Sequence, residues 1–441
     1  MNMNKDALEL IKENYINFSK YTMHFRTYPS IYDGCKLVQR RMLYAAFSKA
    51  PASKMVKLSS MTGYGILLHP HAEATDVIVS MGSPHKTAMP MFDTKGNWGD
   101  NFGNPASASR YLECRLNNTA RKLYFSLIDQ APFENFEVEE EPLYLPTLFP
   151  LALLQGCFSV GQGTPNPLIP DLQFEDLKKF AMNYIKTGEK SVTKQNFVRL
   201  VDYDKIRDDK DKDDSICRLL NTGKGSIYFA PKVELKGNTI TISNLYILAQ
   251  FSSLLDRFKD DIQADKIDIR DESAEERVWV IEKVKNKSFD MEECAKIVKS
   301  KFTYKENFCM YFHDEEGRVK PYSLGEVIEA CYGKYKEAYE KKLNTEYQQL
   351  CEQKSILVCL ADMCDYTDIV TDNKLTDKDK VQMLSEKIDF PDYIIEKALQ
   401  KPISWLKNDE KAINKAEKDI QVNLNKGKNI GKTILADLDK V

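Results

Sequence analysis

A long helical stripe in the C-terminal third places the strongest limit on how this chain can fold. Apolar and aromatic side chains there recur every three or four residues: Tyr332, Tyr335, Tyr339, Leu343, Tyr347 and Leu350. That spacing puts them on one face of a single helix. A last helix, predicted to begin near Asn408, has a similar stripe. Two such helices predict either an antiparallel coiled-coil arm or a helical subdomain packed on the core.

The middle of the chain predicts a mixed α+β structure. Residues 132–170 are apolar and interrupted by prolines and glycines, which is typical of short strands and turns. Residues 226–242 predict a hairpin that turns at Lys236-Gly237-Asn238, and alternation resumes at 278–281. We expect a helix near 172–187 and a solvated loop over the charge run 208–214. The expected fold class is therefore multidomain α+β.

The N-terminal part predicts a compact helical module. Helices are expected over 5–25 and 36–50, followed by shorter ones across 53–82 that Gly63 and Gly65 would interrupt. A Gly/Asn-rich loop then spans 93–105, and a further helix would carry Tyr111 and end near Asp129. Three short helices followed by such a loop predict a helix-turn-helix with a wing, a shape that docks on DNA.

Charge is unevenly distributed along the chain. The formal net charge is −3, but residues 1–125 hold 16 Lys/Arg against 9 Asp/Glu, a balance of +7. The remainder holds 47 against 57, a balance of −10. A basic N-terminal third on an acidic body indicates a localised site for a polyanion. Ordinary charge scatter is the alternative.

Composition argues against several other classes. Ten cysteines without a CxxC pair and only five histidines make a zinc cluster a poor hypothesis and favour reduced thiols in a cytoplasmic protein. We find no apolar run long enough to span a bilayer, and Met1 to Glu13 does not have the pattern of a signal peptide.

Arg110 and Tyr111 are adjacent in the basic region, and they suggest covalent chemistry. A tyrosine phenol has a pKa of about 10, and a neighbouring guanidinium stabilises the phenolate. The same cation can balance charge on a phosphate under attack. Most Arg-Tyr dipeptides are ordinary surface residues, so the pair has meaning only through its setting.

That setting resembles the A subunit of type IIA DNA topoisomerases, as in DNA gyrase and topoisomerase IV. Seven segments occur in the family's order: Asp33 to Tyr44, His69 to His71, Gly96 to Gly99, Ser107 to Leu116, Gly223 to Gly225, Ile269 to Ser273, and Tyr322 to Leu324. Gln39 departs from the pattern, because the family has a histidine there. Length and the separate-subunit layout are closest to the medium subunit of a bacteriophage topoisomerase.

The resemblance implies a domain layout. It predicts an N-terminal arm helix (1–25), a winged-helix domain with the active-site tyrosine (26–130), and a mixed α/β tower domain (131–323). A coiled-coil arm with a helical C-gate for dimerisation would follow (324–441).

The resemblance also implies roles for single residues. Tyr111 would attack a phosphodiester and form a 5′-phosphotyrosyl link, with Arg110 and Arg26 at the same phosphate. His71 would donate a proton or a hydrogen bond and His69 would line the site, although either histidine could simply be packed. The remaining predicted DNA contacts are phosphate contacts from Lys36, Arg40 and Arg41, and an intercalating wedge at Phe158, for which a core position is the alternative.

Mg²⁺ and ATP are expected to be bound mainly by a partner subunit with Toprim and ATPase domains. Asp202-Tyr203-Asp204 has a suitable spacing but lies beside the charge run, so we interpret it as structural. Gly161-Gln162-Gly163 is too short for a phosphate loop.

The expected assembly is a homodimer within a hetero-oligomer, without a membrane, in the cytoplasm (that of the host if the protein is viral). Bacterial members of the family that the chain resembles continue into a DNA-wrapping β-propeller, whereas this sequence ends at Val441. The resemblance therefore implies relaxation or decatenation of double-stranded DNA during replication, and not the introduction of negative supercoils. One alternative is a non-catalytic winged-helix DNA-binding dimer. Another is a tyrosine recombinase, against which the early position of Tyr111 counts.

Overall fold

The computed structural model divides into two compact units, Met1–Tyr335 and Lys336–Val441. The structure describes residues 7–69, 74–87, 89–100, 104–135, 138–161, 164–201, 212–246, 248–274, 276–407 and 409–440. Each unit contains a hydrophobic core of its own. Within the described ranges, no helix combines the length and the apolar character that a membrane span requires.

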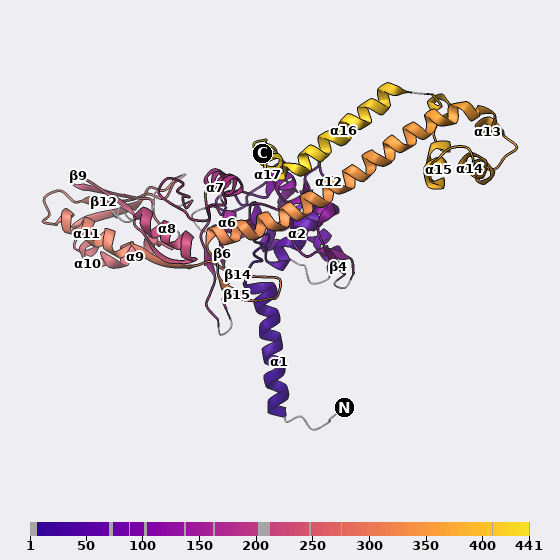
Figure 1. The fold of residues 1–441 in the computed structure, drawn as a ribbon. Helices are drawn as coiled ribbons and strands as arrows, with labels where there is room; N and C mark the ends of the chain where they lie inside the picture. The colour runs from indigo at the N-terminus through magenta and orange to yellow at the C-terminus, as the bar shows by residue number, and fades with distance from the viewer. Residues whose placement is uncertain are drawn as a thin grey trace. The chain divides into compact units, whose positions relative to one another are not determined.

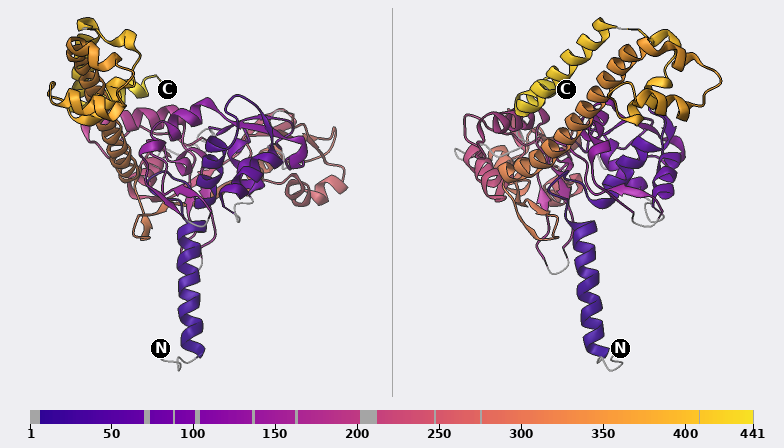
Figure 2. Two further views of the ribbon diagram at one scale, coloured as in Figure 1. Left: turned by 90° about the vertical axis from the view of Figure 1, so that its right-hand side faces the viewer. Right: turned by 45° about the vertical axis from the view of Figure 1, so that its right-hand side comes forward.

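The first unit starts with an isolated helix. Helix α1 (Ala7–Thr22) continues into a π-helical turn, η1 (Met23–Thr27). It extends away from the rest of its unit (Figure 2). Its large apolar side chains are exposed: Leu10, Ile11, Tyr15, Ile16, Phe18 and Tyr21. The predicted helix over 5–25 is confirmed in type.

Three helices and a small sheet follow. The helices are α2 (Leu37–Ser48), α3 (Leu58–Leu68) and α4 (Thr75–Gly82). The antiparallel sheet has the order β1 (Val56–Lys57), β3 (Glu113–Leu116), β2 (Phe92–Lys95). The expected helices are present, but Gly63 and Gly65 lie inside α3 and do not interrupt it. Burial of Leu58, Met61 and Leu68 outweighs the weak helix propensity of glycine.

The helix expected to carry Tyr111 and run to about Asp129 is wrong. Tyr111 ends a short 3₁₀ turn, η2 (Ser109–Tyr111), and strand β3 follows it. The helix begins only at α5 (Asn118–Phe125), which Asn117 caps by accepting a hydrogen bond from the Ala120 N–H. A second 3₁₀ turn, η3 (Ile128–Gln130), comes next. Pairing with β1 and β2 on both sides decides for a strand here, and sequence neighbours do not reveal such pairing.

Residues 131–201 hold the predicted short strands and turns. They form the hairpin β4 (Phe133–Asn135) and β5 (Glu140–Pro142), helix α6 (Leu151–Gln155), the hairpin β6 (Cys157–Phe158) and β7 (Leu168–Ile169), and helix α7 (Phe174–Thr187). Helix α7 confirms the helix expected near 172–187. Gly34 is required beside α6, because its φ is +67° and a Cβ there would lie 2.5 Å from the Leu151 nitrogen.

Two four-stranded sheets complete most of the first unit. One has the order β6-β7-β13-β8 and the other β11-β12-β10-β9. The further strands are β8 (Lys224–Phe229), β9 (Lys232–Lys236), β10 (Thr239–Ser243), β11 (Ile267–Asp271), β12 (Trp279–Lys283) and β13 (Tyr304–Cys309). The helices are α8 (Lys212–Thr222), α9 (Phe251–Arg257), α10 (Lys259–Gln263) and α11 (Met291–Lys301).

The predicted hairpin at residues 236–238 is confirmed, since β9 and β10 pair across it. Its first strand is shorter than expected, because the chain leaves one sheet after Phe229 and joins the other at Lys232. The loop predicted over the charge run 208–214 is wrong for residues 212–214, which begin helix α8. Residues 208–211 lie outside the described part.

A small hairpin, β14 (Tyr311–His313) and β15 (Val319–Pro321), leads into the long helix α12 (Leu324–Asp362). This helix confirms the one predicted from the tyrosine stripe. It continues from the first unit into the second.

The second unit pairs α12 with the C-terminal helices. These are α16 (Glu410–Lys428) and α17 (Ile430–Leu438). Contacts join Tyr339 to Asp437, Glu346 to Asn423, and Lys354 to Glu417. Because partners along α12 come from progressively earlier positions, the helices run antiparallel (Figure 1). Coiled-coil packing itself stays a prediction.

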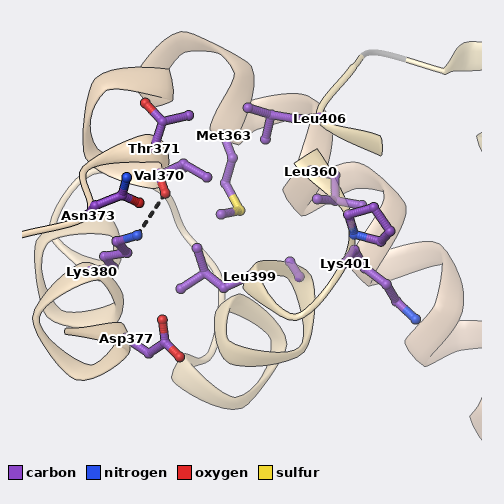
Figure 3. Close-up of a pocket in the computed structure, with 12 residues that line it drawn as sticks. Leu360, Met363, Val370, Thr371, Asn373, Asp377, Lys380, Leu399, Lys401 and Leu406 are labelled. Carbon is purple, nitrogen blue, oxygen red and sulfur yellow. Dashed lines mark hydrogen bonds between the residues drawn. The ribbon is translucent and has the colours of Figure 1, made fainter. Parts of the chain in front are cut away.

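A small helical cluster joins these helices. It consists of η5 (Met363–Tyr366), α13 (Thr367–Thr371), α14 (Asp377–Ser385), α15 (Asp392–Leu399) and η6 (Ile403–Trp405). The expectation of a loop-rich segment over 364–380 is therefore wrong. Thr376 caps α14, and Met363, Ile369 and Leu384 are buried in a common core. A cavity of about 190 Å³ lies within this cluster, where Lys380 donates to the Val370 carbonyl (Figure 3).

Candidate active site

Tyr111 is presented to solvent with a cation beside it. Its side chain is 63% exposed, and the Arg110 guanidinium carbon lies 4.8 Å from its ring centroid. A phenol in this position is accessible to a large substrate. The adjacent positive charge can face an oxygen of a bound phosphate.

The backbone at and just after Tyr111 is held on two sides. The Leu58 N–H donates to the Leu112 carbonyl at 2.9 Å, and Lys57 forms an ion pair with Glu113 at 2.7 Å. On the other side, Gly96 has a φ of +103°, and a Cβ there would lie 3.1 Å from the Tyr111 carbonyl oxygen. The chain at Gly96 therefore approaches the backbone of Tyr111 closely.

That loop is folded back on itself. The Ser107 N–H donates to the Asn97 carbonyl, and Asn104 donates to the Asp100 carboxylate through its side chain at 2.6 Å. Trp98 is buried and donates its indole N–H to the Lys95 carbonyl. Residues 101–103 lie outside the described part. The described loop therefore braces the turn that carries Tyr111.

Arg40 faces the interior and not the surface. It is 7% exposed, and it donates to both oxygens of the fully buried Asp33 at 2.6 and 3.1 Å. Asp33 also accepts the Cys35 and Leu145 N–H groups. Burial disfavours the charged guanidinium, but Asp33 more than compensates and raises the pKa of Arg40 above its ordinary value.

Arg41 has a similar internal partner. It is 8% exposed and donates to Glu141 at 2.6 Å, a carboxylate that is only 2% exposed. The His69 Nδ1 lies 3.3 Å from the other oxygen of Glu141, so Arg41 and His69 flank one carboxylate. His71, predicted to donate a proton or a hydrogen bond, lies outside the described residues, as does Asp202-Tyr203-Asp204.

Lys36 and Phe158 are brought together. The Lys36 ammonium donates to the Phe158 carbonyl at 3.1 Å and to the Ser159 hydroxyl. The Phe158 side chain is 63% exposed, so the alternative of a core position does not hold. Arg26 is exposed at the end of η1, and the Thr27 hydroxyl next to it reaches the Val160 carbonyl.

Six of the nine predicted site residues thus fall into three groups. Arg110 contacts Tyr111, Arg41 and His69 meet at Glu141, and Lys36 meets Phe158. Asp33 and Glu141 were not predicted as partners of the arginines. The sequence held one signal for the burial of Glu141. Glu141 directly precedes residues 142–170, a stretch without any charged side chain.

A histidine pair borders the buried arginine. His24 and His313 have ring centroids 4.1 Å apart and line a cavity of about 360 Å³ together with Arg40, Tyr32 and Tyr144. Burial, with the neighbouring His24 as a further cause, lowers the pKa of His313 to about 4. Burial and the Arg40 charge also lower the pKa of His24. Both rings are therefore neutral at neutral pH.

The described residues contain no group of three or more His, Cys, Asp or Glu side chains arranged to hold a metal ion. The catalytic and DNA-contact roles of these residues stay predictions.

Comparison with known proteins gives the chain its family. The family profile that describes the A subunit of DNA gyrase/topoisomerase IV matches residues 26–439. The A subunit of DNA topoisomerase 4 from Borreliella burgdorferi is 30% identical over 169 residues, which cover 37% of this chain and 26% of that protein. The A subunit of DNA gyrase from Borrelia hermsii is 25% identical over 373 residues, covering 79% and 45%.

A third relative, the DNA gyrase A subunit of Haloquadratum walsbyi, is 26% identical over 304 residues, covering 62% of this chain and 33% of that protein. The chain therefore spans between about a quarter and a half of the length of these relatives. Because the family profile extends over almost the whole chain, the chain belongs to the family of DNA gyrase and topoisomerase IV A subunits.

Proposed function

We propose that this chain is the DNA breakage–rejoining subunit of an ATP-dependent type IIA DNA topoisomerase. The observation that carries the proposal is the exposed Tyr111 phenol with the Arg110 guanidinium 4.8 Å from its ring, within a chain of this family. Each strand of a gate duplex would be linked to one Tyr111 while a second duplex passes, so that DNA is relaxed or decatenated.

In the proposed step, the Tyr111 oxygen bonds to phosphorus and the bond from phosphorus to the 3′ oxygen breaks. The phenolic proton leaves and the 3′ oxygen gains a proton, so the step is an exchange of one ester for another. A phenolate leaves more readily than an alkoxide, so the 3′ hydroxyl can reverse the reaction without an external energy source. Arg110 balances the charge of the phosphorane-like transition state.

The other predicted site residues have supporting roles in this proposal. Arg26, exposed beside the hairpin that carries Phe158, would reach the same phosphate. By the family resemblance, His69 would line the site and His71 would donate a proton or a hydrogen bond. Phe158 enters a base step of the gate duplex. We assign Arg40 and Arg41 to the positioning of α2, because direct phosphate contacts would require release of Asp33 and Glu141.

The proposed assembly follows from the chemistry. Cleavage of both strands requires two tyrosines related by the dyad of the duplex, which a twofold dimer provides. A partner subunit with Toprim and ATPase domains would bind Mg²⁺ and ATP. The dimer would work in the cytoplasm, which is that of the host if the protein is viral.

The proposed domains follow the family layout. We assign an arm helix to 1–25 and a winged-helix domain to 26–130, in which α2, α3, α4 and the β1-β3-β2 sheet would dock on DNA. A tower domain at 131–323 and a coiled-coil arm with a C-gate at 324–441 complete the proposal.

The decisive experiment traps the covalent intermediate. The full chain and its partner subunit are incubated with Mg²⁺ and uniformly labelled supercoiled DNA, and denaturant is added. We expect DNA covalently bound to this chain through the 5′ phosphate, and none with Tyr111→Phe. Tyr228→Phe, at another exposed tyrosine, is the matched control and should retain the adduct.

DNA binding without an adduct in the intact complex would contradict the proposal. That outcome would instead favour a non-catalytic winged-helix DNA-binding dimer. An adduct that survives in Tyr111→Phe would place the nucleophile elsewhere in the chain.

A further inference from the structure

The β6–β7 hairpin presents two apolar side chains on one side. Phe158 is 63% exposed and Val160 is 68% exposed, whereas the neighbouring Cys157 and Ser159 are half-buried. Successive residues of a strand point to opposite faces, and the ladder continues past β6 because the Ser159 N–H donates to the Pro167 carbonyl at 3.3 Å. Phe158 and Val160 therefore form one continuous apolar edge.

Lys36 holds the opposite side of this strand. Its ammonium donates to the Phe158 carbonyl at 3.1 Å and to the Ser159 hydroxyl. Burial raises the pKa of the Cys157 thiol, and the nearby Lys36 charge opposes that shift. The base of Lys36 is fixed as well, because its N–H donates to the Gln39 side chain at 2.9 Å. Two of the three ammonium donors of this lysine, and its backbone N–H, are thus used within the protein.

Two further contacts fix the same hairpin to the segment before Lys36. The Thr27 hydroxyl reaches the Val160 carbonyl at 3.5 Å, and the Tyr28 hydroxyl donates to Pro165 or Thr164 at 2.7 Å. Hydrogen bonds from Thr27, Tyr28 and Lys36 therefore hold the hairpin in place behind its apolar edge, and a side chain that separates stacked bases needs such a rigid backbone.

The distribution of charge around the Phe158–Val160 edge indicates which kind of ligand it binds. Residues 142–170 contain no charged side chain, although 29% of the whole chain is charged. The hairpin thus carries no carboxylate that would repel a phosphate backbone, and the exposed Arg26 lies beside its anchor at Thr27. An uncharged apolar edge flanked by a cation fits a base step of duplex DNA, where apolar side chains unstack neighbouring bases.

We propose that Phe158 and Val160 together form a two-residue wedge that enters one base step of duplex DNA, and that Lys36 positions this wedge instead of contacting a phosphate. The proposal rests on the proposed function, and it adds Val160 and a changed role for Lys36. Lys36 acts through the backbone of Phe158, so it is a positioning residue.

The test measures bending and salt dependence separately on the full chain with its partner subunit. Fluorescence energy transfer across a gate-length duplex reports the bent fraction. Losing hydrogen bonds from a charged donor predicts a roughly tenfold lower bent fraction in Lys36→Met, with partial recovery in Lys36→Arg. We expect Val160→Ala to lower the bent fraction less than Phe158→Ala, since it removes less apolar surface.

The salt series distinguishes the two roles of Lys36. A lost phosphate contact would reduce the slope of log affinity against log salt by about one. We expect an unchanged slope in Lys36→Met, equal to that of the exposed control Lys299→Met. A reduced slope with normal bending overturns the positioning role.

Wild-type bending in Val160→Ala overturns the two-residue wedge. If Phe158→Ala bends DNA like the wild type, the wedge of the proposed function fails as well. If the wild-type complex neither bends nor cleaves DNA, the proposed function itself fails.

Discussion

The arginines near the predicted DNA site have two contrasting surroundings. Arg110 lies at the surface, where its guanidinium faces the exposed ring of Tyr111. Arg40 and Arg41 lie inside, where each faces a buried carboxylate, Asp33 or Glu141. A count of positive charge treats all three alike, yet only Arg110 has its charge available to a polyanion without breaking an internal ion pair.

Removal of the buried charge should have the largest effect on stability. Arg40→Met leaves Asp33 buried without its cation, and breaking such a pair costs about 3–5 kcal/mol. Urea denaturation should show the loss as a lower unfolding midpoint. Arg115→Met is the matched control, because Arg115 and its partner Asp93 are 36% and 40% exposed and should contribute at most about 1 kcal/mol. Equal shifts in the two variants would remove the distinction between buried and exposed arginines.

Removal of the exposed charge should act on chemistry instead. Arg110→Ala should slow formation of the covalent adduct roughly 10²- to 10³-fold, the usual effect of losing one transition-state charge partner. Its unfolding midpoint should match the wild type. Arg257→Ala offers a close control, since its guanidinium lies 5.4 Å from the ring of Phe258 in the same dipeptide arrangement. A normal cleavage rate in Arg110→Ala would contradict the role of the pair.

Acid should weaken the buried surroundings through the histidines beside Arg40. The pKa of His313 is about 4 when folded, below the ordinary 6.5, so the unfolded chain takes up the proton first. The contribution of neutral His313 to the free energy of unfolding is fully present above pH 6.5. It decreases as the pH drops toward 4, by about 3 kcal/mol at most. Arg40 and His24 disfavour the added charge, whereas Asp33 and Asp314 favour it.

Unfolding midpoints measured from pH 7.5 to 4 would show this dependence. His313→Gln should flatten the curve over that window, because the variant cannot take up the proton. An identical pH dependence in wild type and variant would exclude His313 as its source.

The local sequence pattern was sufficient to predict several helices and strands. The tyrosine stripe predicted α12, and the turn at Gly237 predicted the β9–β10 hairpin. Both depend on residues close in sequence, where periodicity and turn preference act. The residues around Tyr111 were misassigned to a helix, because their strand is held by partners at Val56–Lys57 and Phe92–Lys95. Tyr111 itself was located by its motif, and its catalytic role stays a prediction.

By itself, the sequence determined the family, the long C-terminal helix and the position of the Arg110-Tyr111 pair, because each depends on order or spacing along the chain. Only the tertiary structure decided which cations remain available to DNA. Glu141 reaches Arg41 across one hundred residues, and Lys36 reaches Phe158 across 122. Such pairings depend on how distant segments pack. The sequence around a lysine or arginine does not identify the carboxylate or carbonyl group that it contacts in the folded protein.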